Sequence, residues 1–424
     1  MDKMLKLAGA PYWVRGLLLL MGLGMFAQLA GLTFNNDDSR YATQVHLLLL
    51  LPSLVLLLWL RGAMDLWKQL PATLLLLLMG WVLLVAGLYG GGGKSLGIWL
   101  KVMLLLLLYV FAVACLVRCN ERRFTLVVLA ALAMTVFFAW LTLYYQFGVL
   151  DRSLEYSAIR WNRLYELGWN GYADLEHPII SGLYYGGFLV VLTWFFVRFK
   201  VGAWRMLFVS LSMVGLVFYV FLTFSRGAWF SVLVGGFVLL LLFRNLKSRS
   251  LLWGGAAALL LMVYLFWPEI QNEREIGVNG RDLIWGAWFE RLHDFWLIGA
   301  GAGADFKFTF PAGTSQAGTS YYTAHSLYLQ IWHQYGIVGI LLFVALLCSL
   351  LWKGWTHRAQ PLAHLALSLL VFAMVAMVSE VHTIFQRPTS YWVLFWFPVG
   401  ILLGVQKPEP EHASEPLAPP AEAD

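Results

Sequence analysis

Residues 251–267 read LLWGGAAALLLMVYLFW and residues 336–352 read GIVGILLFVALLCSLLW, and a polar segment from Pro268 to Tyr335 separates these two runs. Each run is nearly free of charge and has the length of a membrane-spanning helix, which takes roughly 17–25 residues. The polar segment is rich in Arg, Trp, Tyr and Gly. These features predict a loop that is anchored at a membrane surface by the helices on both sides of it.

The composition of the whole chain extends this prediction. Of its 424 residues, 60% are hydrophobic and only 12% are charged, and the mean hydropathy is +0.72. A soluble protein has about 25% charged residues, so we expect an integral membrane protein. The apolar runs are too long for the alternating strands of a membrane barrel, which span about 10 residues each. We therefore predict an all-α, polytopic membrane protein.

Twelve apolar runs are predicted to span the membrane, and the first is interpreted as a retained span because no small-residue cleavage site follows it. The predicted spans are residues 16–34, 41–60, 71–90, 97–117, 124–148, 179–197, 206–223, 227–243, 251–267, 336–352, 361–380 and 391–405.

The positive charges predict the orientation of these spans. Most of the 29 Lys and Arg residues fall in short connections on one side, which is typical of the cytoplasmic side. Both termini are then cytoplasmic, and two long loops, 151–178 and 268–335, face the periplasm of a bacterium. This orientation accounts for most of the net charge of +6, so we expect no nucleic-acid partner.

The chain is predicted to have four parts. They are N-terminal helices with the first loop (1–205), a core with the second loop (206–345), C-terminal helices (346–406) and a disordered, Pro- and Ala-rich cytoplasmic tail (407–424).

The second loop is predicted to contain short helices. Trp285, Trp288, Leu292 and Phe295 recur at helical spacing, which predicts an amphipathic helix with its aromatic side toward the membrane. A glycine-rich turn, 297–303, follows, and no strand–helix unit surrounds it, so it does not match a nucleotide-binding fingerprint. A second helix is predicted to begin at Thr323 and to end near Gly336.

Arg226 lies at the outer end of two adjoining spans, in Phe224-Ser225-Arg226-Gly227-Ala228. A charge at this depth is costly, and it usually faces a bundle interior or a polar cavity. The alternative is an arginine that extends to the membrane interface. We favour the functional interpretation because Gly227 and Ala228 leave room for a bulky ligand.

Arg281 begins the predicted amphipathic helix. A guanidinium binds phosphate through two parallel hydrogen bonds and stays charged at any relevant pH. Several such groups at a membrane surface would suit the pyrophosphate of a lipid carrier. A structural ion pair with the neighbouring Asp282 is the competing interpretation.

His325 lies in Tyr321-Tyr322-Thr323-Ala324-His325-Ser326-Leu327. A single histidine at a helix start is more often a capping or packing residue. In this loop, however, it accompanies arginines and aromatic residues, and imidazole is a base near neutral pH. The outer loops contain no cluster of His and carboxylate residues, so we expect no metal and no other cofactor.

These residues resemble a known family. An ordered set of five motifs is similar to the O-antigen ligase and polymerase superfamily. The motifs are Phe224-Ser225-Arg226-Gly227-Ala228-Trp229, Arg281 with Trp285, Gly299-x-Gly301, Ala324-His325-Ser326-Leu327-Tyr328-Leu329-Gln330 and Gly336-Ile337-Val338-Gly339. The similarity is firmest over about 206–345, and Arg163-Leu164 and His177-Pro178 resemble the first outer loop of the family. Many members have His-Asn where this chain has His325-Ser326.

The resemblance implies a membrane glycosyltransferase of the GT-C type in the bacterial inner membrane. A ligase of this family moves O-antigen from undecaprenyl pyrophosphate to lipid A–core during lipopolysaccharide biosynthesis. By resemblance, His325 is the catalytic residue, and the pyrophosphate is bound by Arg226 and Arg281, helped by Arg163. Residues expected to contact the substrates are Arg160, His177, Tyr328 and Trp285. The expected partners are these two glycolipids and the membrane lipids.

Two alternatives remain open at this point. An O-antigen polymerase would use the same chemistry with a second carrier-linked glycan as acceptor. A transporter of polyprenyl-linked oligosaccharides would have broken helices and ionisable residues at the membrane midplane. Glu380 and His382, at the end of the eleventh predicted span, are the residues that fit transport best.

Overall fold

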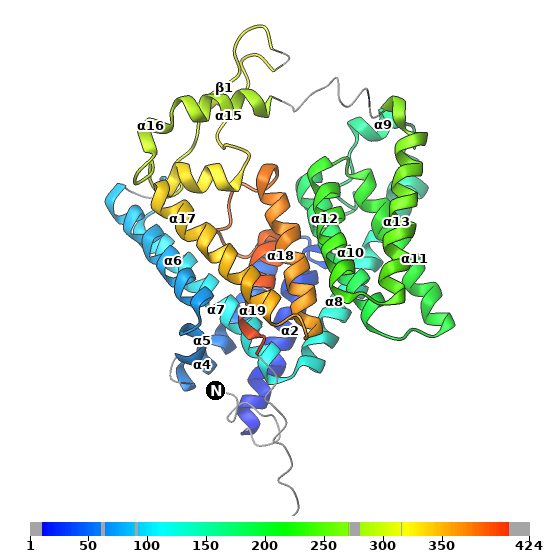
Figure 1. The fold of residues 1–424 in the computed structure, drawn as a ribbon, viewed down its shortest axis with the longest axis horizontal. Coiled ribbons are helices and arrows are strands. Elements are labelled where there is room, and N and C mark those ends of the chain that lie inside the picture. The colour runs from blue at the N-terminus through cyan, green and yellow to red at the C-terminus, as the bar shows by residue number, and fades with distance from the viewer. Residues whose placement is uncertain are drawn as a thin grey trace, which may run out of the picture.

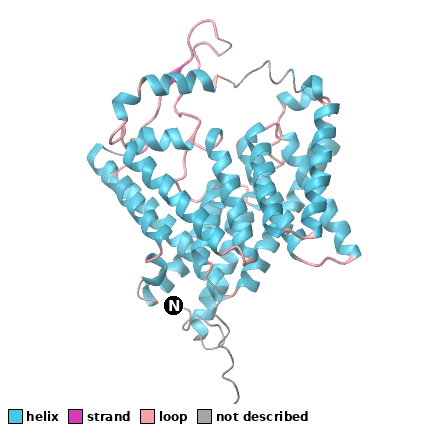
Figure 2. Cartoon of the chain, viewed as in Figure 1, coloured by secondary structure: helices cyan, strands magenta, loops and turns pink. Residues whose placement is uncertain are grey.

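The protein is an all-α bundle in this computed structural model, which describes residues 11–60, 64–89, 92–269, 271, 280–314 and 316–406 (Figures 1 and 2). Within these residues, eleven helices are long and apolar enough to cross a membrane. The prediction of a polytopic α-helical membrane protein is confirmed. The predicted tail, 407–424, lies outside the described residues.

The candidate membrane spans follow the predicted order along the chain. They are α2 (Tyr12–Phe34), the continuous helix Asp38–Trp59 made of α3 (Asp38–Val45), η1 (His46–Leu50) and α4 (Leu51–Trp59), α6 (Leu70–Tyr89), α7 (Leu96–Cys119), α8 (Glu121–Tyr144) with η2 (Tyr145–Val149), α10 (Pro178–Arg198), α11 (Ala203–Leu222), α12 (Arg226–Phe243), α13 (Leu246–Leu265), α17 (Leu327–Thr356) and α18 (Pro361–Ser379). The twelfth predicted span, 391–405, is a shorter apolar helix formed by η3 (Trp392–Trp396) and α19 (Phe397–Gly404).

Several short elements complete the chain. They are α5 (Met64–Trp67), α9 (Tyr156–Trp161), α15 (Arg281–Glu290), α16 (Leu292–Phe295) and an antiparallel pair of two-residue strands, β1 (Phe308–Thr309) and β2 (Ser320–Tyr321). The elements α15, α16 and β1 cover one end of the bundle (Figure 1). We call this the loop end.

Three of the apolar helices contain a π-helical turn, and a following proline explains two of these turns. The turn η1 ends at Leu50, two residues before Pro52, and η3 ends at Trp396, two residues before Pro398. Proline has no backbone N–H and crowds the preceding turn, so the hydrogen-bond ladder widens locally.

Small residues bring the central helices into close contact. A Cβ at Gly235 of α12 would lie 2.8 Å from the Cβ of Phe372 on α18, and a Cβ at Gly400 of α19 would lie 2.5 Å from the Cβ of Val113 on α7. Without a hydrophobic driving force between helices in lipid, such close backbone approach is a main source of packing energy. The pair α12 and α18 therefore forms a closely packed support below the loop end.

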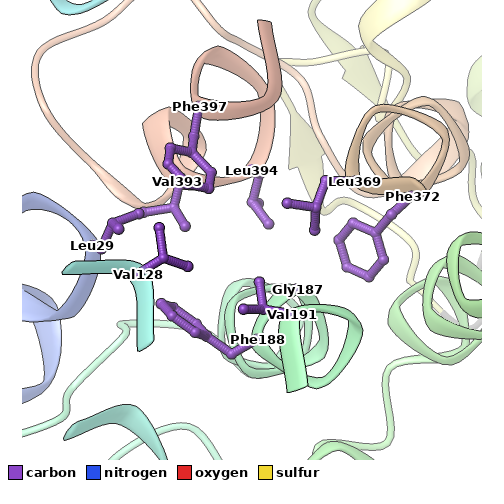
Figure 3. A pocket seen from close by; sticks show the side chains of 10 residues that line it. All are labelled: Leu29, Val128, Gly187, Phe188, Val191, Leu369, Phe372, Val393, Leu394 and Phe397. Atoms are coloured by element: carbon purple, nitrogen blue, oxygen red, sulfur yellow. The ribbon is translucent and has the colours of Figure 1, made fainter. Parts of the chain in front are cut away.

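A small cavity lies in the core between α2, α8, α10, α18, η3 and α19 (Figure 3). It measures about 10 Å³, and ten apolar residues line it, among them Leu29, Phe188 and Phe397. A buried water needs two to four polar partners, so this cavity is a gap in apolar packing and not a ligand site.

The second loop differs from its prediction in two ways. The predicted amphipathic helix is split into α15 and α16, and Trp288 and Phe295 are buried against Phe306 and Phe310 of the same loop, not turned to the membrane. This happens because 300–324 folds back over the aromatic residues. The second predicted helix begins at Leu327 instead of Thr323.

The label α17 covers two helical segments that meet in a kink at Gly336, near where the sequence predicted that the second loop helix ends. Gly336 has φ 66°, so the helix is kinked there, and the glycine-rich turn supplies the missing hydrogen bonds. The N–H of Ala300 donates to the carbonyl of His333 at 2.7 Å, and that of Gly301 donates to the carbonyl of Gln334 at 3.3 Å. The turn is therefore a structural cap for the kink.

Candidate active site

The predicted site residues come from separate elements that meet at the loop end. Arg226 is the first residue of α12, Arg281 is the first residue of α15, and His325 precedes α17 by two residues. Glu380 caps the C-terminal end of α18. The structure brings the last three of these groups together, and it places the start of α12 beside them.

Arg281 forms an ion pair across the chain. Its Nη2 lies 3.2 Å from Oε1 of Glu380, and the two side chains are 22% and 4% exposed. The hydroxyl of Ser379 donates to the same oxygen at 3.2 Å. Arg281 is therefore held by a residue on α18 rather than by its neighbour Asp282, which is exposed.

Glu380 also joins this pair to the start of α12. A Cβ at Gly227 would lie 2.3 Å from Cγ of Glu380 and 2.4 Å from Oε1. Only a glycine leaves space for the glutamate here, and the residue before it is Arg226, which is partly buried. The tight turn before Arg226 is set by Phe224, with φ 47°, and by Ser225, whose Oγ accepts from the N–H of Ala228 at 3.3 Å.

His325 is held in an unusual backbone conformation. Its φ is 51°, a left-handed value that few non-glycine residues adopt. Side chains fix the backbone of the preceding residue, Ala324, on both sides: Nε1 of Trp285 donates to its carbonyl at 2.9 Å, and Oε1 of Gln330 accepts from its N–H at 3.0 Å. Strain of this kind is kept only where the surroundings impose it.

The side chain of His325 is placed to accept a proton. Its Nε2 is buried and has no hydrogen-bond partner among the described residues. Burial first, and then the positive charges of Arg281, His382 and His177, lower the pKa of His325 to about 4. The imidazole is therefore neutral at pH 7, and Nε2 is free to act as a base. His325 therefore lies within electrostatic range of Arg281, His382 and His177.

The first loop contributes His177 and Arg163. His177 caps α10, and its Nδ1 accepts from the N–H of Ile179 at 3.2 Å. Burial and then the charge of Arg163 lower the pKa of His177. Arg163 itself donates to the carbonyls of Thr223 at 2.8 Å and Phe224 at 3.1 Å. In this structure Arg163 thus holds the turn that leads to Arg226.

Three other residues that were predicted to contact the substrates are Trp285, Tyr328 and Arg160. Trp285 donates to Ala324, and the hydroxyl of Tyr328 donates to the carbonyl of Met374 on α18 at 3.0 Å, so both side chains support the site from outside. Arg160 lies in the last turn of α9 and is partly buried.

Sequence comparison relates the chain to known proteins. A family model described as O-antigen ligase matches residues 211–344. An O-antigen ligase of Pseudomonas aeruginosa is 24% identical over 384 residues, which cover 90% of this chain and 90% of the relative. The chain is similar to O-antigen ligases in its core and along most of its length.

The superfamily match includes Arg226, Arg281 and His325, but it ends before Glu380. The sequence singled out Glu380 only as a residue that would fit transport, and it gave no partner for it. Gln330 was visible only as part of the family motif. Both become site residues through contacts with segments distant in the chain.

The last question about the site is whether its residues could hold a metal ion. Across the described part of the chain, no group of three or more His, Cys, Asp or Glu side chains is arranged to hold a metal ion. The titratable groups at the loop end that we assign to the candidate site are arginines, histidines and one glutamate.

Proposed function

We propose that this protein is an O-antigen ligase that transfers O-antigen from undecaprenyl pyrophosphate to lipid A–core. The observation that carries the proposal is a histidine whose buried Nε2 has no hydrogen-bond partner among the described residues and which lies within electrostatic range of the Arg281 guanidinium. A base and a fixed positive charge are the two groups that displacement of a pyrophosphate requires.

The reaction is a single displacement at the anomeric carbon of the donor sugar. Nε2 of His325 accepts the proton of an acceptor hydroxyl as that oxygen forms the new glycosidic bond. The bond between the anomeric carbon and the pyrophosphate oxygen breaks, and the pyrophosphate leaves with the electron pair. Arg281 and Arg226 stabilise the departing negative charge. Attack from the opposite face inverts the anomeric configuration.

Donor binding also strengthens the base. The charge of Arg281 is one cause of the low pKa of His325. A bound diphosphate neutralises that charge and favours the imidazolium form, so the pKa of His325 rises when the donor is in place. The histidine becomes a better proton acceptor only in the loaded enzyme.

Glu380 has a positioning role in this proposal. It holds Arg281 from α18 while its Oε2 has no hydrogen-bond partner among the described residues. The pair keeps the long Arg281 side chain in one orientation, which reduces the entropy lost when the diphosphate binds.

We further propose that the loop end faces the periplasm and that the enzyme lies in the bacterial inner membrane. The first and the last described helices, α2 and α19, have their outer ends on the same side of the bundle. The carbonyl of Leu403 in α19 accepts from Arg118 at the end of α7 and from Lys353 near the end of α17. The helix α17 begins at the loop end, so Lys353 near its other end lies at the opposite end of the bundle. The end of α19, which contacts Lys353, therefore lies at that opposite end too. The N–H of Ala173 in the first loop donates to Thr33, which places the end of α2 at the loop end and its start opposite.

The test is reconstitution of the purified protein with a carrier-linked oligosaccharide in the presence of EDTA. Either lipid A–core or a second carrier-linked glycan is offered as acceptor. Transfer to lipid A–core alone supports the ligase, whereas chain growth on the second glycan identifies a polymerase. Loss of transfer in EDTA would contradict the metal-independent mechanism.

A transporter is the alternative from a different class. Glu380 and His382, the residues that favoured it, belong to the cluster with Arg281 and His325 at the loop end. This supports catalysis at a surface over passage through the midplane. Movement of a labelled carrier glycan across vesicles without any transfer product would favour the transporter.

A further inference from the structure

A second, much larger cavity lies at the end of the bundle away from the candidate active site. It measures about 1250 Å³. It is bounded by the end of α12, the start of α13, the end of α17 and the start of α18. Since α17 begins and α18 ends at the loop end, this cavity lies at the opposite end of the same helices.

The walls of this cavity are apolar, and they reach the outside of the bundle. Leu241 on α12, Leu252 on α13, and Leu367 and Val371 on α18 line it. On α17 the lining includes Trp352, which is 69% exposed. Sites for drug-sized ligands measure roughly 300–1,000 Å³, so the space is large enough for the acyl chains of a lipid.

The rim of the cavity is positively charged. Arg244, Arg249 and Arg358 line it, each of them is exposed, and no Asp or Glu is among the described lining residues. Arg358 is oriented by Trp355, because its Nη1 donates to the Trp355 carbonyl at 2.9 Å and its guanidinium lies 4.6 Å from the ring centre. Exposed tryptophans and arginines at one level are typical of a membrane interface.

The protein itself leaves this region loosely packed. In α13, only Ser248 is buried among the described residues, whereas α12 is packed closely against α18. The helix α13 therefore has few protein contacts that fix its position. A molecule in the cavity would supply apolar contacts to α13 on one side and to α17 on the other.

We propose that this cavity binds one anionic phospholipid. Its acyl chains would lie on the apolar walls, and its phosphate would contact Arg244, Arg249 and Arg358. Basic pockets between membrane helices recognise anionic headgroups, and each arginine near the surface contributes about 1 kcal/mol. The proposal is independent of the transfer reaction at the loop end.

Native mass spectrometry of the full chain in detergent tests the proposal with phosphatidylglycerol and phosphatidylcholine of identical acyl chains. We expect one phosphatidylglycerol to be retained in preference to phosphatidylcholine. The variant Arg244→Gln/Arg249→Gln/Arg358→Gln should bind it about 100-fold more weakly. Equal binding of both lipids would overturn the proposal.

A matched control removes three charges from the same end of the bundle outside the cavity. Arg122→Gln/Arg123→Gln/Arg205→Gln changes exposed residues at the starts of α8 and α11. This variant should keep the binding of the wild type. If it loses as much affinity as the cavity variant, the preference reflects general surface charge and the site does not exist.

Filling the cavity distinguishes a lipid from a small anion. Leu252→Trp keeps all three arginines and occupies the acyl-chain space from the loosely packed α13. We expect this variant to lose phosphatidylglycerol while its lipid-free unfolding temperature stays close to that of the wild type. Retained binding, or displacement of the lipid by glycerol 1-phosphate, would show an anion site alone and would contradict the proposal.

Discussion

Arg281 and Glu380 are 99 positions apart in the chain, and their side chains form an ion pair of 3.2 Å at the loop end. The pair connects the second loop to the central helix α18, and Gly227 contacts the same glutamate from α12. One buried carboxylate thus sets the position of a charged loop residue relative to the membrane-embedded helices.

The first prediction concerns the ion pair directly. Gly227→Ala would place a Cβ 2.3 Å from Cγ of Glu380, displace the glutamate and release Arg281. We expect transfer to fall by about 10²-fold, since a displacement of 1 Å in a positioning group has that effect. Gly236→Ala on the same helix is the control, because a Cβ there has nothing within 4 Å. Equal activity of the two variants would contradict the role of Glu380.

Arg281 is expected to bind the donor. Arg281→Ala should weaken binding of the carrier-linked oligosaccharide, measured by titration calorimetry in detergent, and reduce transfer by about 10²–10³-fold. Arg281→Lys should recover only part of the loss, because an ammonium cannot form two parallel bonds to a phosphate. Arg291→Ala, at an exposed arginine of the same loop, should change neither property. Unchanged donor affinity in Arg281→Ala would remove the residue from its assigned role.

His325 is expected to act in the chemical step. His325→Ala should lower kcat by about 10²–10⁴-fold while donor affinity stays close to that of the wild type. The exposed His293, whose side chain is 79% accessible, supplies the matched control His293→Ala. Loss of donor binding in His325→Ala would point to a structural role instead.

The pH dependence of transfer should report the same histidine twice. In the free enzyme the pKa of His325 is about 4. The value of kcat/KM for the donor should therefore stay constant as the pH is lowered to about 4 and should decrease at lower pH. In the loaded enzyme the diphosphate raises this pKa, so the imidazole becomes protonated at a higher pH than in the free enzyme. We therefore expect the acid limb of kcat at a higher pH than that of kcat/KM. Coincident limbs would show that the donor does not act on His325.

Gln330 is expected to position His325 through the Ala324 peptide. It is 3% exposed, its Oε1 accepts from Ala324, and its Nε2 donates to the carbonyl of Ala304 at 3.2 Å. Gln330→Met should lower kcat by about 10²-fold with little change in KM for the donor. Gln334→Met breaks a bond to the same Ala304 carbonyl without touching Ala324, so it should keep most activity. Equal losses in both variants would show a general packing effect.

Helix order and span positions were predictable because apolar run length is a local property. Charges and motif residues also singled out Arg226, Arg281 and His325, whose roles stay predictions. The sequence failed where the structure depends on distant contacts. Thr323 to Ser326 have a helical pattern, but Gln330 and Trp285 hold the Ala324 peptide outside the helix.

The glycine-rich turn shows the same limit. The glycines of this segment predicted only a turn. In the structure, the N–H groups of Ala300 and Gly301 donate to backbone carbonyls of α17 that lack a partner within the helix because of the kink at Gly336. Neither segment alone reveals this relationship, because the unpaired carbonyls exist only after α17 bends.

The sequence by itself determined the all-α membrane architecture, since hydrocarbon length and the cost of buried charge act on each segment separately. Only the tertiary structure decided that Glu380, rather than Asp282, pairs with Arg281 and that the N–H of Ala324 is held by Gln330. Hydrogen bonds and ion pairs depend on distances of a few ångströms between groups far apart in the chain. Those distances are fixed by how the helices pack, which no local pattern specifies.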